Sequence, residues 1–351
     1  MYVKSLSLKA RKLAKIEDIC QAYKAAGLYT HVYVSCGFLY EDRNLFEFSI
    51  LPEDRSVFDL ASLTKALVTT PLVLWRCLKA AKDPRALKIS ELFGDISLDE
   101  VGAGSHNLSV ADYLRHETGL PAWRNLYTEC QHQRQSLRDV LMRSTSKSGS
   151  ADLYSDVGFI TLGQLLERSS NQNILDEWKF LCELFEIPSA KKFGSGPSFD
   201  LHNAISTGYC PVRQRELLGE VHDENCWALG GMAGHAGLFG GGAAVSSYLR
   251  QLWQSSVGRV VFEKNFCEAA TPGDSLLGWR KGKDASANAF AEGRGCGHMG
   301  FTGTAFWVDP LTRSYCVVLT NRVISGRVSP AMKAFRSQVL SSLWYKIKGS
   351  F

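Results

Sequence analysis

The strand-like segments of this 351-residue chain lie near its two ends, while the middle is mostly helical in pattern. Extended stretches are predicted at 31–40 and 44–51 near the N-terminus, and at about 275–280, 304–309 and 314–320 near the C-terminus. Helical periodicity dominates from about 88 to 229. A sheet in such a chain must be assembled from both ends. The pattern therefore predicts an α+β fold, with a sheet region built from both chain ends and a mostly helical region inserted between them.

The chain is accordingly divided into two regions. Residues 1–80 and 230–351 are expected to form the sheet region and residues 81–229 the helical region. Helices are predicted at 10–27, from near 62, and at 109–116, 136–143, 157–169, 174–186, 243–254 and 330–347. Pro71 falls inside the second helix, where a kink is expected because proline lacks the N–H that an interior helical position donates.

The composition limits the classes of partner. With 45% apolar and 21% charged residues, the chain resembles an ordinary soluble globular protein. The net charge of +5 comes without a basic block interleaved with aromatics, so no nucleic-acid partner is expected. No apolar run reaches the roughly 20 residues of a membrane span. The basic N-terminus is not followed by an apolar segment, so a cytoplasmic location is expected, or a periplasmic or secreted one if a signal peptide has been removed. Oligomeric state is left open.

The ten cysteines are scattered, and none forms a C-x-x-C pair or a Cys/His group with metal-ligand spacing. They are expected to be buried reduced thiols, which favours a reducing compartment, although one or two disulfides stay possible in an exported protein. Neither a metal nor an organic cofactor is expected.

Ser62-Leu63-Thr64-Lys65 is an S-x-x-K pattern at the start of an apolar helix. Positions i and i+3 share a helix face, so the ammonium of Lys65 lies one turn from the hydroxyl of Ser62. The first turn of a helix also presents N–H groups that suit a developing oxyanion. Two further S-x-x-K matches, 144–147 and 189–192, lie in polar, loop-like stretches and are interpreted as chance.

Tyr154-Ser155-Asp156 precedes a second apolar helix. A tyrosine hydroxyl projecting from such a loop beside a cation can act as a general acid or base. The alternative is structural: Tyr154 packs at a helix start and Asp156 caps the helix.

His298-Met299-Gly300 leads through Phe301 into an apolar strand. A glycine on an edge strand lets a substrate backbone approach and pair with the strand. The N–H of Phe301 could join that of Ser62 in an oxyanion hole. A similar triplet at 235–237 precedes a glycine run and is interpreted as a structural turn.

In this order, the three motifs resemble those of the serine β-lactamase and penicillin-binding-protein superfamily, and most nearly the branch of class C β-lactamases, D-aminopeptidases and family VIII esterases. The spacing suits that branch, with 92 residues from Ser62 to Tyr154 and 144 from Tyr154 to His298. The segments 58–65, 116–121, 229–239 and 319–322 are also similar to the family's sequences. The resemblance covers about 30 to 345 and implies a serine β-lactamase/DD-peptidase-like fold. In this α+β fold an antiparallel β-sheet is flanked by helices, and the active-site cleft is expected between the sheet region and the helical region.

The resemblance also implies roles. Ser62 would be acylated, Lys65 and Tyr154 would manage its proton, and the N–H groups of Ser62 and Phe301 would hold the oxyanion. Asp156 would orient Lys65 or the substrate amide.

The substrate-binding residues are also carried over from the resemblance. His298 would line the edge strand, and Gly300 and Thr302 are expected to contact substrate. The segment 220–225 resembles one in bacterial relatives linked to cell-wall recycling, some of them muramyl-L-alanine amidases, which makes His222 and Asp223 candidate substrate-binding residues. The alternative for these two is a hydrogen-bonded loop with a satisfied histidine. A metal site that also includes His235 is disfavoured by the spacing.

Two positions depart from the family pattern. The family's lactamases usually carry Lys-Thr-Gly where this chain has His298-Met299-Gly300, so efficient β-lactam hydrolysis is not expected. Asp156 replaces the usual Asn, which should keep Lys65 protonated and shift the role of base toward Tyr154.

The expected function is a serine hydrolase that acts through an acyl-enzyme on an amide bond of peptidoglycan-derived peptides or muropeptides. The alternatives are a carboxylesterase for small esters and a non-catalytic ligand-binding protein.

Overall fold

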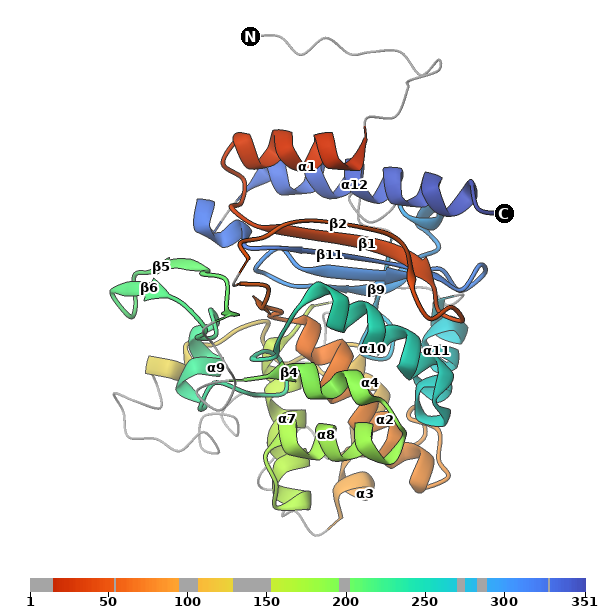
Figure 1. The fold of residues 1–351 in the computed structure, drawn as a ribbon. Helices are drawn as coiled ribbons and strands as arrows, with labels where there is room; N and C mark the ends of the chain where they lie inside the picture. The colour runs from red at the N-terminus through yellow and green to blue at the C-terminus, as the bar shows by residue number, and fades with distance from the viewer. Residues whose placement is uncertain are drawn as a thin grey trace.

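A computed structural model describes residues 15–53, 55–94, 107–128, 153–195, 203–269, 275–282, 289–327 and 329–351 (Figure 1). Within these ranges the centre is a six-stranded antiparallel sheet with the order β2-β1-β11-β10-β9-β8. Its strands are β1 (Val32–Phe38), β2 (Asn44–Ile50), β8 (Arg280–Lys281), β9 (Cys296–Met299), β10 (Ala305–Val308) and β11 (Ser314–Thr320). The predicted α+β fold with an antiparallel sheet flanked by helices is confirmed.

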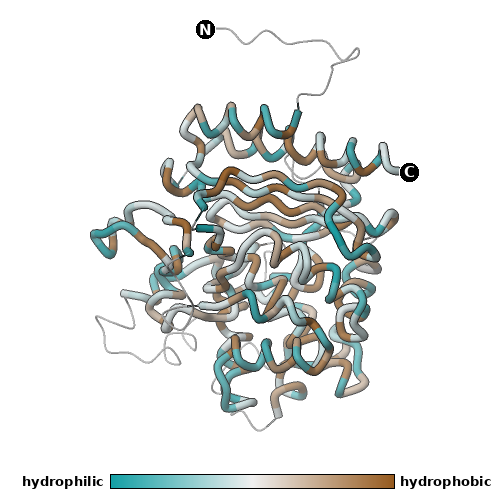
Figure 2. The backbone as a smooth tube through the Cα atoms, viewed as in Figure 1, coloured by the Kyte–Doolittle hydropathy of each residue, from teal (hydrophilic) through white to brown (hydrophobic). Residues whose placement is uncertain are grey.

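Burial along the strands follows their sequence pattern. Every residue of β1 and β11 is buried, and the two strands pair antiparallel with Val32 opposite Thr320. These continuous apolar runs occupy the middle of the sheet, which is covered on both faces, and Figure 2 shows their hydrophobic character. The outer strand β2 instead alternates between half-buried and exposed positions, as expected where one face meets solvent.

Helices cover both faces of the sheet (Figure 1). On one face lie α1 (Ile16–Ala25) and α12 (Pro330–Lys348), whose apolar side chains, such as Ile19, Phe335 and Leu343, pack on the sheet in one buried cluster. On the other face lie α10 (Gly242–Gln254) and α11 (Ser256–Ala269). The second core cluster extends from this face into the helical part of the molecule.

The helical part contains α2 (Thr70–Lys79), α3 (Ile89–Phe93), α4 (Val110–Leu114), α7 (Asp156–Ser170), α8 (Ile174–Leu184) and α9 (Glu224–Ala228), with the 3₁₀ turn η3 (Pro188–Lys192). Two further 3₁₀ turns, η6 (Ala291–Gly293) and η7 (Arg322–Ser325), precede β9 and follow β11. Two small sheets join the helical part: β3 (Phe58–Asp59), β7 (Phe239–Gly240) and β4 (Phe193–Gly194) form one, and β5 (Gly208–Cys210) and β6 (Arg215–Leu217) form the other.

The helix after Ser62 accommodates Pro71 by a π-helical turn, η1 (Lys65–Thr69), and α2 continues directly from it. Pro71 therefore lies at the start of α2, where a missing N–H is tolerated. Pro71 has no N–H to donate to the carbonyl of Leu67. This carbonyl instead accepts a hydrogen bond from the hydroxyl of Tyr248 at 2.8 Å. The structure thus has a π-helical turn immediately before Pro71, where the sequence predicts a kink.

Other expectations differ from the structure in detail. The segment predicted as a strand at 275–280 is mostly a turn in which the N–H of Gly278 donates to the carbonyl of Leu276, and β8 begins only at Arg280. Helix α11 was not predicted, because its apolar periodicity is weak. The helix predicted at 136–143 lies outside the described residues.

The eight cysteines whose side chains the structure describes are all buried and free of disulfides. None of the described helices combines the length and apolarity needed to cross a membrane.

Candidate active site

Ser62 lies in a turn between β3 and the π-helical turn η1. The residue before it, Ala61, has a positive φ of 48°, a conformation that alanine rarely adopts. The buried carboxylate of Asp59 stabilises this conformation by accepting the N–H of Ala61 at 2.8 Å. On the other side, the Thr64 hydroxyl donates to the Ala61 carbonyl at 2.7 Å. These two hydrogen bonds hold the backbone on both sides of Ala61 and thereby fix the position of Ser62.

Lys65 lies beneath Ser62 and is fully buried. Its ammonium donates to Ser62 Oγ at 3.0 Å and to the carbonyl of His235 at 3.1 Å, and it lies 2.7 Å from Asp156 Oδ1. Two of the three N–H groups of the ammonium are thus used in hydrogen bonds, and Asp156 supplies the counter-charge. Burial disfavours the charge, but Asp156 and Tyr154 outweigh it, so the pKa of Lys65 is raised above its ordinary value. This direction agrees with the effect predicted for Asp156.

Tyr154 lies beside the same ammonium, with its ring centroid 5.0 Å from Lys65 Nζ. The guanidinium of Arg280 lies 5.6 Å from the ring. Burial raises the pKa of Tyr154, although Lys65 and hydrogen bonding to Lys65 and Ser62 oppose the increase. Both shifts favour the protonated forms of Tyr154 and Lys65.

The loop at 116–122 holds Tyr154 in place. The N–H of Ser155 donates to Nδ1 of His116 at 3.0 Å, and the imidazole lies 4.5 Å from the Tyr154 ring. Burial lowers the pKa of His116 to about 3, so the ring is neutral. Ser155 Oγ accepts the N–H of Gly158 and is the N-cap of α7. The structural alternative that made Asp156 the cap is therefore wrong, and its carboxylate is available to Lys65.

The turn after β9 is tied to the segment that precedes Ser62. Thr302 Oγ1 donates to the carbonyl of Asp59 at 2.8 Å, and Thr304 Oγ1 donates to the carbonyl of Leu60 at 3.0 Å. Among the described residues, the N–H groups of Ser62 and Phe301 have no hydrogen-bond partner. The two N–H groups predicted as the oxyanion hole thus lie on two segments that are fastened together.

Gly300 makes this close approach possible. A Cβ at this position would lie 2.1 Å from Thr304 Oγ1 and 2.7 Å from the carbonyl oxygen of Leu60. The strand is also open beside it as far as the structure describes the chain, because β8 pairs there only with Cys296 and Gly297 and leaves the last residues of β9 unpaired on that side. The predicted edge is present over this short stretch.

His298 is buried and neutral. Burial, with Lys65 and Arg280 nearby, lowers its pKa well below the ordinary value. Nδ1 contacts the carbonyl of Met299 at 2.9 Å and must therefore carry the proton, which leaves Nε2 as an acceptor. Within the described ranges Nε2 has no hydrogen-bond partner, although the side chain is only 1% exposed and lines the cleft.

His222 and Asp223 lie on the other side of Ser62. The N–H of His222 donates to Asp59 Oδ2 at 2.7 Å, and burial lowers the pKa of its imidazole to about 4. Asp223 caps α9 and contacts Nε2 of His235 at 2.9 Å. Within the described ranges, no group of three or more His, Cys, Asp or Glu side chains is arranged to hold a metal ion.

The predicted site residues meet in one cleft with two sides. The larger side, of about 480 Å³, is lined by Ser62, Tyr154, Asp156, His298, Gly300 and Phe301. The smaller side, of about 240 Å³, shares Ser62, Asp156 and Phe301 and adds Thr302, His222 and Asp223. Lys65 lies below both sides. The Thr302 hydroxyl is used within the protein, so its geometry favours a positioning role.

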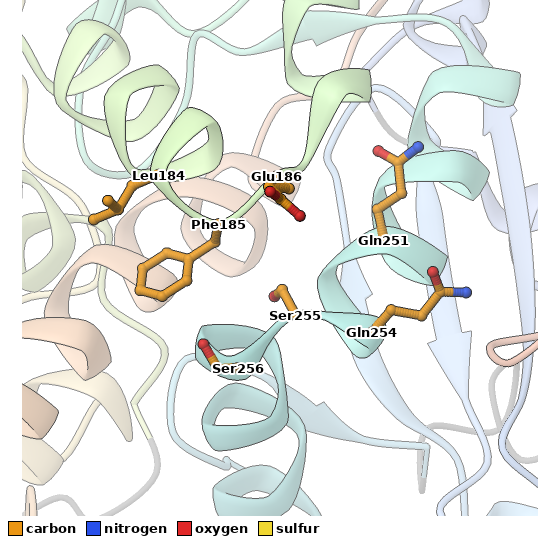
Figure 3. A pocket seen from close by; sticks show the side chains of 7 residues that line it. All are labelled: Leu184, Phe185, Glu186, Gln251, Gln254, Ser255 and Ser256. Atoms are coloured by element: carbon orange, nitrogen blue, oxygen red, sulfur yellow. The ribbon is translucent and has the colours of Figure 1, made fainter.

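Another cavity, of about 400 Å³, lies between the ends of α8 and α10 (Figure 3). Glu186 is the ionisable residue in its lining, and Ser255 Oγ donates to the carbonyl of Leu252. Its lining contains serines but no lysine or tyrosine, so it lacks the combination of side chains that surrounds Ser62.

Sequence reasoning missed Asp59, Thr304 and Arg280. Asp59 and Thr304 act through backbone groups of segments far apart in sequence, and no spacing rule connects them. Asp59 could have been found by its position, because it lies three residues before Ser62 in the segment 58–65 that resembles the family.

No protein-family model matches the sequence. A curated N-acetylmuramyl-L-alanine amidase from Bacillus subtilis is 26% identical over 341 residues, which covers 83% of this chain and 74% of that protein. The crystal structure of a D-amino acid amidase from Ochrobactrum anthropi matches with a TM-score of 0.67 and 15% identity, covering 95% of this chain and 98% of that one.

A class C β-lactamase from Rhodobacter sphaeroides matches with a TM-score of 0.65 and 15% identity, over 95% of this chain and 99% of that one. These structural likenesses show the fold, and the curated relative adds a sequence relationship over most of the chain. Together with the three motifs, they show an enzyme of the serine hydrolase type that has the fold of the serine β-lactamase and penicillin-binding-protein superfamily.

Proposed function

We propose that the protein hydrolyses an amide bond of peptidoglycan-derived peptides or muropeptides through an acyl-enzyme on Ser62. The observation that carries the proposal is the Ser62 Oγ to Lys65 Nζ hydrogen bond of 3.0 Å, in a cleft that also presents the partnerless N–H groups of Ser62 and Phe301. A nucleophile, a proton acceptor and oxyanion donors in one cleft are the parts that acyl transfer requires.

The proton chemistry runs through the Lys65 and Tyr154 pair. Loss of one proton from the pair leaves a base beside Ser62, and this base takes the hydroxyl proton as Oγ attacks the carbonyl carbon. The oxyanion is held by the two N–H groups. The pair then gives the proton to the amine nitrogen, the C–N bond breaks, and the acyl group stays on Ser62.

Deacylation uses the same two roles, with water as the nucleophile and Ser62 as the leaving group. Water attacks the ester carbonyl while the pair accepts its proton, and the proton then returns to Ser62 Oγ as the acid is released. Because both pKa shifts favour the protonated pair, activity is expected to rise with pH until one proton is lost.

The choice of an amide in cell-wall fragments is supported by two comparisons. The curated relative is named an N-acetylmuramyl-L-alanine amidase, and one structural neighbour is a D-amino acid amidase. Met299 supplies no hydroxyl between His298 and Gly300, which argues against an efficient β-lactamase.

Mass spectrometry of the protein incubated with defined muropeptides, simple esters and a penicillin tests the proposal. A muropeptide product that appears with wild type and not with Ser62→Ala would support it and identify the broken bond. Turnover of esters alone would replace the proposal with a carboxylesterase. The absence of any product or adduct would replace it with a ligand-binding protein.

A further inference from the structure

A tight turn at 233–236 lies against the ammonium of Lys65 and supplies one of its hydrogen-bond acceptors. The carbonyl of His235 accepts Lys65 Nζ at 3.1 Å, and the other acceptor, Ser62 Oγ at 3.0 Å, is the nucleophile itself. Lys65 is fully buried, so bulk water does not replace a hydrogen bond that its ammonium loses. The place of the His235 carbonyl therefore helps to set where Lys65 lies relative to Ser62.

The backbone of this turn is attached on both sides of residue 235. Thr69 Oγ1 donates to the carbonyl of Gly234 at 2.6 Å, and the N–H of Ala233 donates to the carbonyl of Ala236 at 3.0 Å. Gly234 also lies against α7, where a Cβ at this position would be 2.0 Å from the carbonyl oxygen of Phe159. The two neighbours of residue 235 are thus held by backbone contacts, and its own side chain is a further point of attachment.

The imidazole of His235 is buried and held by one group. Its Nε2 lies 2.9 Å from Asp223 Oδ1. A carboxylate oxygen only accepts, so Nε2 carries a proton and donates it to Asp223. The other ring nitrogen, Nδ1, has no hydrogen-bond partner among the residues that the structure describes. A single directional contact therefore fixes the orientation of the ring.

Asp223 is in turn fixed by the helix that it caps. Its Oδ1 accepts the N–H of Cys226 at 2.7 Å in the first turn of α9, and Cys226 Sγ donates to the carbonyl of Ala236 at 3.2 Å. Burial opposes the charge of Asp223, but His235, the Cys226 N–H and Lys65 outweigh it and lower the pKa of the carboxyl group. Asp223 is therefore ionised, and its charge and that of Lys65 stabilise each other.

Exposure separates a substrate contact from an action through Lys65. The side chain of Asp223 is 24% exposed and lines the smaller side of the cleft, so it could touch a substrate. His235 is absent from the lining of both sides. A loss of activity on removal of the His235 side chain cannot then come from a lost contact with substrate.

We infer that Asp223 and His235 form a positioning pair for the base of the reaction. The Asp223 carboxylate holds the His235 imidazole, and the imidazole holds the His235 carbonyl against the ammonium of Lys65. Both residues act through Lys65. The inference rests on the acylation of Ser62 in the proposed function and is independent of which acyl group is transferred.

The rate at which a fluorophosphonate labels Ser62 measures this role without a known substrate. We expect His235→Ala and Asp223→Ala each to lower the rate roughly 10- to 100-fold, because a base displaced by about 1 Å has an effect of this size. His235→Gln should restore most of the rate, since its side-chain N–H can still reach Asp223. The double alanine variant should label no more slowly than the slower single one, because the two residues act as a unit.

Asn173→Ala is the matched control for loss of the α9 cap. It removes the N-cap of α8, which accepts the N–H of Asp176, and should label at the wild-type rate. Wild-type labelling rates in both single alanine variants at positions 223 and 235, or losses that add in the double variant, would overturn the inference.

The pH profile of labelling separates positioning from a loss of folded protein. A carbonyl that accepts from an ammonium favours the charged form of Lys65, and so does the charge of Asp223. Both alanine variants should therefore move the rising limb to lower pH, by up to about one unit, whereas a merely destabilised protein keeps the limb in place. The other titratable groups that face Lys65 are the same in every variant: His116, Tyr154, Asp156, Cys226 and His298.

Asp223→Asn tests the charge in a protein that keeps the fold. Asparagine still caps α9 and still accepts a hydrogen bond from His235, so the labelling rate at high pH should stay close to that of the wild type. The rising limb should nevertheless move to lower pH. A limb that stays in place in this variant would contradict the part of the inference that concerns charge.

Crystal structures of the variants separate failure of this inference from failure of the proposed function, because they require no turnover. The carbonyl of residue 235 should stay within about 3.5 Å of Lys65 Nζ in His235→Gln and leave that range in His235→Ala and Asp223→Ala. If the carbonyl moves in this way but Ser62 of the wild type is never acylated, the positioning stands and the hydrolase proposal fails. If Ser62 is acylated and the carbonyl stays in place in both alanine variants, the inference fails alone.

Discussion

Replacement of Gly300 by alanine should reduce activity far more than stability. The new Cβ would lie 2.7 Å from the Leu60 carbonyl oxygen, whereas an ordinary contact begins at about 3.4 Å, so the two segments must separate by about 0.7 Å. The Thr304 hydroxyl, 2.1 Å from the same Cβ, cannot simply rotate away without losing its hydrogen bond to Leu60. The Phe301 N–H moves with this turn.

A shift of this size takes one donor out of the narrow distance range in which it stabilises an oxyanion, a loss of about 10²- to 10³-fold in kcat. The overpacking itself should lower the free energy of unfolding by about 1–3 kcal/mol. The assay is kcat on an activated ester, with urea unfolding in parallel. Gly158→Ala is the control, because its Cβ would meet nothing closer than 3.7 Å. A Gly300→Ala enzyme with unchanged kcat would refute the oxyanion-hole assignment.

Three further predictions concern titratable groups. Asp156→Asn should move the rising limb of kcat/KM to lower pH, because Asp156 raises the pKa of both Lys65 and Tyr154; a pH profile that stays in place would contradict this. Tyr154→Phe should lower kcat about 10²- to 10⁴-fold with a nearly unchanged urea midpoint. Burial raises the pKa of Asp59 from 3.8 to about 6, so its contribution to stability is most favourable below pH 3.8 and is lost as the pH rises through about 6. The free energy of unfolding of the wild type should therefore fall relative to Asp59→Asn by about 3 kcal/mol between about pH 4 and pH 7, measured in urea at both pH values.

The sequence predicted the site best where chemistry depends on local spacing. Ser62 and Lys65 are three residues apart, and the helix that follows dictates that their side chains meet. Strands β1 and β11 were predicted within two residues because their continuous apolar runs leave little choice of position. The order and spacing of the three motifs, which resemble those of the family, then assigned Tyr154 and His298 to the same site.

What the sequence did not predict depends on contacts between distant segments. The carboxylate of Asp59 joins the turn before Ser62 to the loop at His222, a pairing 163 positions apart that leaves no periodic signal. The basic side chains that line the cleft likewise form no basic run in the sequence, because Arg280 and Lys333 come from different elements. The strand predicted at 275–280 became a turn because local apolar character says nothing about which neighbour pairs with it.

The central claim is that Ser62 is the nucleophile, and covalent trapping tests it most directly. Intact mass measurement and peptide mapping after treatment with a fluorophosphonate should show one adduct, located on Ser62. The adduct should be lost in Ser62→Ala and retained in Ser189→Ala, which removes the serine of another S-x-x-K match in this chain. An adduct that persists in Ser62→Ala, or that maps to a different residue in the wild type, would contradict the account.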